Sequence, residues 1–316
     1  MPSSRNANPI SASSRGVPDV ASSGSNLALW IAAARPKTLV LAMAPVLAGI
    51  GLAVFRTGEL AAGTALLTLI AAVAIQIGTN LHNDASDYER GTDTADRLGP
   101  PRATAEGWFS LEQVKRAAHL AFGLAFVIGL ALVVRGGWPI LAIGIASLVA
   151  GYAYTGGPRP IAYGPFGELY VLLFFGLAAV GGTYYLQTLS FDWSAFMVGV
   201  ALGLPAAAVL LLNNYRDLET DRIAGRRTLC HHLGRPRARV LYGLLLLASI
   251  AILGLTFGPT IAWPLLAAVP LGVLPTLKLV RGATGKQINP LLGQTGLFQA
   301  AVTVLLLVGF ALSRIA

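Results

Sequence analysis

Long runs of apolar residues recur along this chain of 316 residues, and they restrict its fold more than any other feature. Each run has few or no charges and roughly the 17 to 25 residues that a helix needs to cross a bilayer. Only 12% of the residues are charged, against about 25% in soluble domains. The sequence therefore predicts an all-α polytopic membrane protein with nine transmembrane helices, at residues 38–55, 60–79, 117–134, 137–154, 169–189, 193–212, 240–258, 260–277 and 290–313.

The basic residues predict the orientation of these helices. Loops on the cytoplasmic side of a membrane carry an excess of Lys and Arg. With a cytoplasmic N-terminus, only Arg56, Arg135 and Arg314 of the 23 basic residues fall on the outer side. The net charge of +9 is then explained by topology and by anionic lipid headgroups, and no nucleic-acid partner is expected.

The first residues of the chain differ in composition from the rest. Residues 1–26 are rich in Ser, Ala, Pro and Gly, so they are predicted to be a disordered tail. A targeting peptide remains an alternative, because the segment contains Arg5 and Arg15 and no acid before Asp19. Residues 27–316 are predicted to form one transmembrane domain.

Two polar stretches place carboxylates directly after apolar runs. Asp84 and Asp87 follow the second run, and Asp217 and Asp221 follow the sixth. Acids three or four residues apart project from one face of a helix, so each stretch offers a carboxylate pair at the mouth of a hydrophobic bundle. An ionisable residue at the membrane edge is costly to bury unpaired, and it therefore indicates a functional site.

The loops that contain these acids mix both signs of charge, which suits a diphosphate ligand. Carboxylates hold Mg²⁺ while part of its water shell is retained, and Arg or Lys side chains neutralise the remaining phosphate charge. The two stretches also look like copies of one another. This repetition predicts two pseudo-symmetric halves whose acids face each other across a central cavity and share one diphosphate through bridging metal ions.

The first stretch resembles the Asp-rich signature of the UbiA superfamily of intramembrane aromatic prenyltransferases, in the branch that acts on 1,4-dihydroxy-2-naphthoate. The matching pattern is N-D-x-x-D, then G-x-D, then D-R-x-G-P-x-R, and its residues here are Asn83, Asp84, Asp87, Gly91, Asp93, Asp96, Arg97, Gly99, Pro100 and Arg102. Residues 34–39, 154–168 and 213–234 match the same branch. The D-R-x-G-P element is usually absent from the 4-hydroxybenzoate and haem O branches.

The carboxylate pairs and the resemblance together give a set of candidate site residues. The expected Mg²⁺ ligands are Asp84, Asp87, Asp217 and Asp221, with Asp93 as a further catalytic residue. Candidate substrate contacts are Asn80, Asn83, Asn214, Arg97, Arg102, Arg226, Arg227, Arg35 and Lys37. Tyr152, Tyr154 and Tyr163 could stabilise an allylic cation through their ring faces, or they could belong to an interfacial aromatic belt.

The resemblance implies transfer of a polyprenyl group from its diphosphate to 1,4-dihydroxy-2-naphthoate with decarboxylation, as in menaquinone synthesis, at the cytoplasmic side of a bacterial inner membrane. Another acceptor, such as homogentisate or 4-hydroxybenzoate, or a phytyl donor for phylloquinone, stays open as an alternative. A transporter for an anion is a second alternative, since transporters also combine two halves with polar residues between them. It is disfavoured because the clustered acids would repel an anion without metal.

Overall fold

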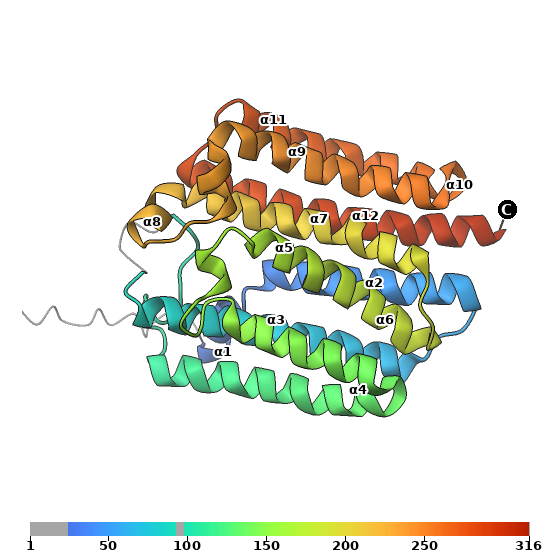
Figure 1. The fold of residues 1–316 in the computed structure, drawn as a ribbon, viewed down its shortest axis with the longest axis horizontal. Coiled ribbons are helices and arrows are strands. Elements are labelled where there is room, and N and C mark those ends of the chain that lie inside the picture. Colours follow the sequence, from blue (N-terminus) through green and yellow to red (C-terminus); the bar gives the residue numbers. More distant parts are fainter. Residues whose placement is uncertain (1–24, 93–97, 316) are drawn as a thin grey trace, which may run out of the picture.

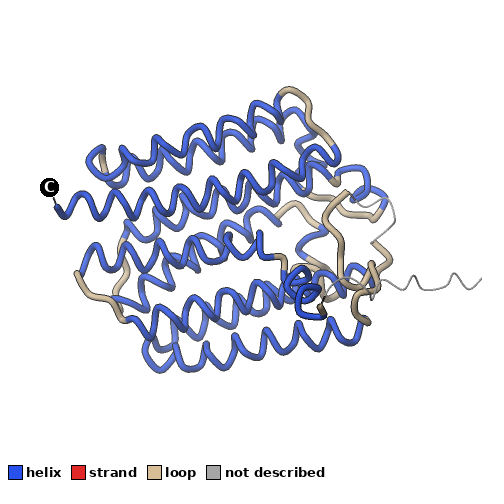
Figure 2. Tube along the Cα trace, turned by 180° about the vertical axis from the view of Figure 1, so that it is seen from behind, coloured by secondary structure: helices blue, strands red, loops and turns tan. Residues whose placement is uncertain are grey.

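The computed structural model describes residues 25–92 and 98–315, and these residues form helices and loops without any strand (Figures 1 and 2). The elements are α1 (Asn26–Ala34), α2 (Pro36–Thr57), α3 (Ala62–Glu89), α4 (Leu111–Ala153), η1 (Ile161–Tyr163), α5 (Gly167–Val171), η2 (Leu172–Ala178), α6 (Ala179–Thr188), α7 (Trp193–Arg216), α8 (Leu218–Ile223), α9 (Leu229–Phe257), α10 (Pro259–Ala262), η3 (Trp263–Ala268), α11 (Val269–Val280), η4 (Gly285–Ile288) and α12 (Asn289–Ile315). The all-α prediction is confirmed. Most of the predicted tail, and Asp93, Asp96 and Arg97, lie outside the described residues.

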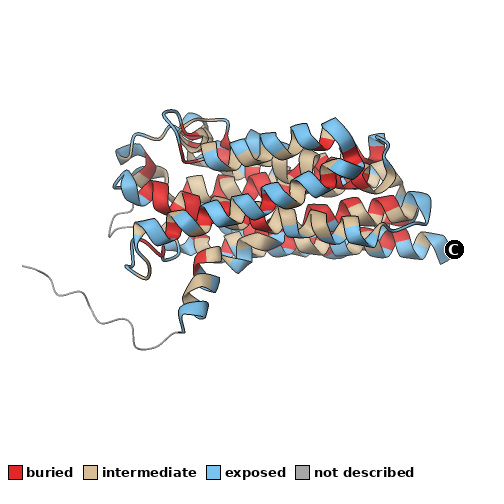
Figure 3. Cartoon of the chain, turned by 90° about the horizontal axis from the view of Figure 1, so that it is seen from below, coloured by how far each residue is buried: buried red, intermediate tan, exposed pale blue. Residues whose placement is uncertain are grey.

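Eight helical stretches of the described chain are long and apolar enough to cross a membrane. They are Pro36–Thr57, Ala62–Glu89, Leu111–Ala153, Gly167–Thr188, Trp193–Arg216, Leu229–Phe257, Pro259–Val280 and Gly285–Ile315. Large apolar side chains of these stretches are exposed, among them Val134 at 90% and Leu255 at 89%. Exposed residues lie along the outer faces of the bundle (Figure 3). Such a surface suits lipid rather than water, so the chain is an integral membrane protein.

One of the eight stretches, α4, folds back on itself. Gly137 within it has φ 63° and ψ −153°, a conformation that glycine adopts without a Cβ clash. A Cβ placed on Gly151 would lie 3.3 Å from the ring of Phe122, although a straight helix would separate these residues by about 44 Å. The sequence predicted two spans that part at this point. The total of nine spans and the orientation of the N-terminus stay predictions.

Helix α7 lies at the centre of the bundle, with 72% of its most apolar window buried. The π-helical segment η2 crosses it closely, because glycines stand on both sides of the contact. A Cβ on Gly176 would lie 2.4 Å from the carbonyl oxygen of Gly199 and 2.9 Å from the Cα of Gly203. The two helices therefore pack with their backbones in contact. Such π-helical segments are frequent next to functional sites.

The polar connections gather at one end of the bundle. Helices α3 and α7 both end there, the loop after α4 begins there, and α8 lies across it (Figure 1, left). Helix α1 joins the same end, where Trp30 stacks on Phe109 at 3.8 Å between ring centroids. The acidic stretches that are far apart in the sequence therefore meet at this end.

Candidate active site

A cavity of about 360 Å³ opens between α2, α3, α4, η2, α6 and α7. Its walls are mostly apolar, and they include Leu132, Ile140, Phe174 and Leu186 from the part of the bundle away from the polar loops. The polar residues that line it near the ends of α3 and α7 include Arg35, Thr38, Gln76, Asn80, Asn83, Tyr154 and Asn213. The shape suits a ligand with a polar head and a long apolar tail.

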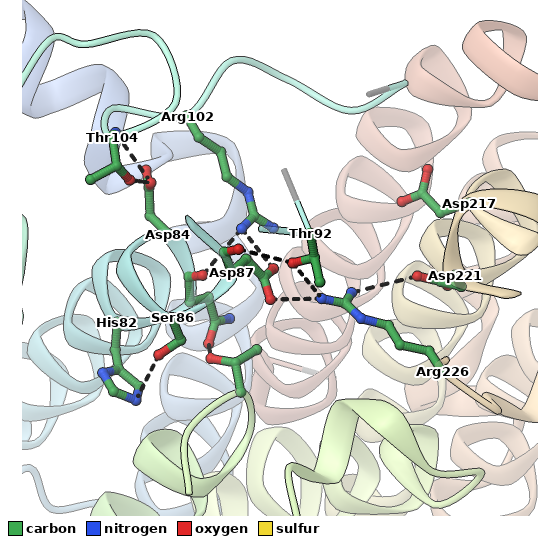
Figure 4. A network of polar contacts seen from close by, with 12 residues as sticks. His82, Asp84, Ser86, Asp87, Thr92, Arg102, Thr104, Asp217, Asp221 and Arg226 are labelled. Atoms are coloured by element: carbon green, nitrogen blue, oxygen red, sulfur yellow. Dashed lines mark hydrogen bonds and ion pairs between the residues drawn. The ribbon is translucent and has the colours of Figure 1, made fainter. Parts of the chain in front are cut away.

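Asp87 is the point where both halves of the polar end meet. It is buried near the end of α3, and Arg102 Nη1 donates to its Oδ2 at 2.6 Å. Arg226, from the loop after α8, donates through Nη2 to Asp87 Oδ1 at 2.6 Å and lies 3.5 Å from Asp221 Oδ1 through Nη1 (Figure 4). Arg226 therefore joins the first acidic stretch to the second.

The second acidic stretch arranges its aspartates differently. Asp221 on α8 is buried, whereas Asp217 lies at the end of α7 and is paired with Arg216 at 2.6 and 2.7 Å. Burial raises the pKa of Asp221 to about 7; Arg226 opposes the shift, and the carboxylates of Asp217 and Asp87 add to it. The negative charges of these three neighbouring carboxylates repel one another. An additional cation bound between them would relieve this repulsion.

Asp84 does not join the other three aspartates. Its side chain points to the loop after α3, where Oδ2 accepts from the Ala103 N–H at 2.8 Å and Oδ1 accepts from the N–H and the hydroxyl of Thr104 (Figure 4). The oxygens of Asp84 accept from the main chain and one hydroxyl of residues 103 and 104, whereas those of Asp87 and Asp217 accept from arginine side chains. That Asp84 ligates metal stays a prediction, and its contacts with a turn distinguish it from Asp87 and Asp217.

The asparagines occupy three different settings. Asn83 and Asn213 line the cavity, each four residues before an aspartate, Asp87 or Asp217. Asn80 also reaches the cavity wall, but its amide is held by the Ala34 carbonyl and the Thr38 hydroxyl at 3.0 and 2.9 Å.

Asn214, a candidate substrate contact in the sequence, is bound to a buried acid, Glu168. Its Nδ2 donates to Glu168 Oε1 at 2.9 Å, and the neighbouring Asn213, which was not among the candidates, lines the cavity. Glu168 was not among the candidates. It is a buried acid at the start of α5 whose Oε2 makes no hydrogen bond, and the signal in the sequence was a lone acid directly before an apolar run.

The remaining candidates separate into near and distant groups. Tyr154 lines the cavity, and Tyr163 lies under the Arg226 guanidinium at 4.9 Å. Tyr152 instead stacks on His82 at 4.3 Å and is half exposed.

Two basic candidates stay outside the cluster. Lys37 and Arg227 have exposed side chains, and only the main-chain N–H of Arg227 makes a contact here, to the Tyr163 carbonyl at 2.9 Å. Arg226, and not Arg227, is therefore the arginine that lies between Asp87 and Asp221.

The comparison with protein families agrees with this arrangement. A family model described as the UbiA prenyltransferase family matches residues 42–302. The chain belongs to this family. The resemblance noted in the sequence is therefore confirmed over most of the chain.

Several curated relatives in the UbiA family are similar over nearly their whole length. A 1,4-dihydroxy-2-naphthoate octaprenyltransferase of Mycobacterium tuberculosis is 40% identical over 277 residues, which is 86% of this chain and 93% of the relative. The enzyme of the same name from Escherichia coli is 35% identical over 90% of this chain and 96% of its own. A solved UbiA homologue from Archaeoglobus fulgidus, bound to DMAPP and Mg²⁺, shares the fold with a TM-score of 0.64 at 16% identity, over 91% of this chain and 99% of its own.

The residues at the polar end fit a magnesium ion together with a diphosphate. The side chains available as metal ligands are carboxylates, and Mg²⁺ prefers oxygen ligands. For the diphosphate, the Nε of Arg226 is buried without a hydrogen bond and can donate to a phosphate oxygen. No three acidic, histidine or cysteine side chains converge on one point within the described parts of this UbiA chain. Mg²⁺ commonly takes one or two protein carboxylates and completes its shell with water and phosphate oxygens, so the site suits an ion that arrives with its diphosphate.

Proposed function

We propose that this chain transfers a polyprenyl group from a polyprenyl diphosphate to 1,4-dihydroxy-2-naphthoate, with loss of the carboxylate, in menaquinone synthesis. The observation that carries the proposal is an apolar cavity lined by Asn83 and Asn213, next to the end of the bundle where Arg226 joins Asp87 to Asp221. The choice of acceptor is supported by relatives of 33 to 40% identity that are named for this naphthoate. The name octaprenyltransferase belongs to those relatives, and the length of the chain transferred here stays open.

The charged residues bind the diphosphate and favour its departure. Asp87, Asp217 and Asp221 would hold magnesium, which neutralises the negative charge that develops on the leaving diphosphate. Arg226 and Arg102 both lie within hydrogen-bonding distance of Asp87, so they stand beside any phosphate that approaches this carboxylate. Guanidinium groups contact phosphate oxygens through two parallel N–H groups, which orients the diphosphate as well as binding it.

The cavity protects the allylic cation that remains. Its walls are apolar, so water that would capture the cation is largely excluded. Tyr154 lines the cavity close to the polar end, where its ring face stabilises positive charge on the allylic carbon. Asn83 and Asn213, one from each half, line the same region and provide amide groups for orienting the polar atoms of either substrate.

The same geometry supports an active site on the cytoplasmic side of a bacterial inner membrane. The loops at the polar end carry most of the basic residues, which favours retention of this end in the cytoplasm. Polyprenyl diphosphate would enter with its head at that surface and its tail in the apolar cavity.

The test is a direct assay of the purified protein in detergent. Magnesium and a radiolabelled polyprenyl diphosphate are combined with a panel of aromatic acids, and products are separated by chromatography. We expect a prenylated naphthoquinol only with the dihydroxynaphthoate, lost with EDTA and with Asp87→Ala. Glu219→Ala is the control, since Glu219 is an exposed acid of α8 at the same end of the bundle, and its carboxylate is 3.6 Å from Arg235. Preference for another aromatic acid would reassign the acceptor, and uptake of the anion into vesicles without product would refute the enzyme reading.

A further inference from the structure

Asp84 lies three residues before Asp87 on α3, yet the two carboxylates serve different parts of the protein. Asp84 is 1% exposed, and its two oxygens receive three hydrogen bonds, from the main chain of Ala103 and from the main chain and hydroxyl of Thr104. Hydrogen bonds from several donors stabilise a carboxylate in its charged form without any metal ion. The burial of Asp84 is thus accounted for by the turn that it holds.

The turn that Asp84 holds carries Arg102. Arg102 Nη1 donates to Asp87 Oδ2 at 2.6 Å and to the Asn83 carbonyl at 3.1 Å. The turn is closed by its own main chain, since Glu106 N–H donates to the Arg102 carbonyl at 2.9 Å and Trp108 N–H to the Ala103 carbonyl at 2.9 Å. Asp84 and Arg102 therefore fasten the same turn to α3 at two neighbouring points.

We propose that Asp84 is a positioning residue that fixes residues 102–104 against α3 and so aims Arg102 at Asp87 and the diphosphate, and that Asp84 does not ligate metal. To reach an ion beside Asp87, Asp84 would have to release two buried main-chain N–H groups, which is unfavourable. The inference rests on the proposed function for the identity of the ligand. The attachment of the turn does not depend on it.

The experiment compares Asp84→Asn with Asp87→Asn and with Thr104→Val. Asn presents an N–H₂ group where Asp84 accepts hydrogen bonds, and Val removes only the Thr104 hydroxyl. Mn²⁺ binding is measured by electron paramagnetic resonance without turnover, in the presence of a non-hydrolysable diphosphate analogue that is saturating for each variant. Tryptic cleavage after Arg102 is followed in the folded protein. The KM for polyprenyl diphosphate is measured with saturating acceptor.

We expect Asp84→Asn to leave Mn²⁺ affinity within about twofold, while Asp87→Asn lowers it by about tenfold or more. Asp84→Asn and Thr104→Val should both accelerate cleavage after Arg102 by roughly tenfold, because local opening of the turn becomes easier. The KM should rise in these two variants more than kcat falls. Because Thr104→Val retains both carboxylates, it decides the matter even if Asp84→Asn does not fold.

Loss of Mn²⁺ binding in Asp84→Asn, with cleavage after Arg102 as slow as in the wild type, would overturn the proposal. Unchanged cleavage in Thr104→Val together with an unchanged KM would overturn it as well. If the wild type itself binds no Mn²⁺ with the analogue, the proposed function fails, and the cleavage rates still decide whether Asp84 holds the turn.

Discussion

Replacement of Arg226 by Gln removes a side chain that contacts an aspartate of each acidic stretch, Asp87 and Asp221. Arg226 is 2.6 Å from Asp87 and 3.5 Å from Asp221, and its side chain is only 17% exposed. Removing one partner of a fully buried ion pair costs about 3 to 5 kcal/mol. The expected loss here is smaller, about 2 kcal/mol, which corresponds to one charge-assisted hydrogen bond. Asp87 keeps Arg102, and the contact with Asp221 is long.

Thermal unfolding in detergent measures this loss. A change of about 2 kcal/mol should lower the Tm by about 3 °C in a chain of this size, because the entropy of unfolding grows with chain length. Magnesium alone should then raise the Tm of Arg226→Gln by more than that of the wild type, because the guanidinium no longer occupies the space between Asp87 and Asp221. The matched control is Arg227→Gln, whose side chain is exposed and which should melt with the wild type.

Two results would refute this reasoning. Equal melting of Arg226→Gln and the wild type, with no gain from magnesium, would show that Arg226 does not bridge the two stretches. An equal loss in Arg227→Gln would show that the effect belongs to the net charge of the loop.

Three further outcomes are expected. Gly176→Ala should destabilise the fold by about 1 to 3 kcal/mol in thermal melts, because its Cβ meets the Gly199 carbonyl at 2.4 Å, whereas Gly181→Ala, in open space, should not. Glu168→Gln should leave the Tm unchanged or raise it, since it removes a buried charge with an unbonded oxygen. Burial alone would raise the pKa of Asp192, but hydrogen bonds from Ser194 and the charge of Arg56 outweigh it and lower the pKa. Asp192→Ala should therefore cost about 1 kcal/mol above the ordinary carboxyl pKa, and the difference should vanish as the pH falls through the lowered pKa.

The helices were predictable because bilayer length and hydrophobicity are properties of continuous segments. Even the reversal inside α4 fell between two predicted spans, since Gly137 interrupts the pattern next to Pro139. The sequence also predicted that the two acidic stretches lie close together, because similar stretches follow the second and the sixth predicted spans. The contact through Arg226 follows from this meeting.

The direction of single side chains was less predictable. Asp84 and Asp87 are close on one helix surface, so their spacing cannot tell which of them contacts Arg226. The residue that binds Asp84, Thr104, lies 20 residues away along the chain. Neighbouring residues on a helix point about 100° apart, which is why Asn213 and Asn214 have different partners. Tyr152 and Tyr154 differ by about 200°, so they could not both have faced the cavity.

The contacts of Asn289 bear on the order in which the protein is made. Asn289, at the start of the last helix, donates to the Leu98 carbonyl at 2.9 Å and accepts from Arg216 at 2.8 Å, and Arg216 in turn holds Asp217. A ribosome releases these segments from the N-terminus onward. Arg226 can link the two acidic stretches before the last helix is made, but the second connection, from Leu98 through Asn289 to Arg216, forms only after that helix has emerged. A partly synthesised chain in the membrane therefore has the site held by one connection instead of two.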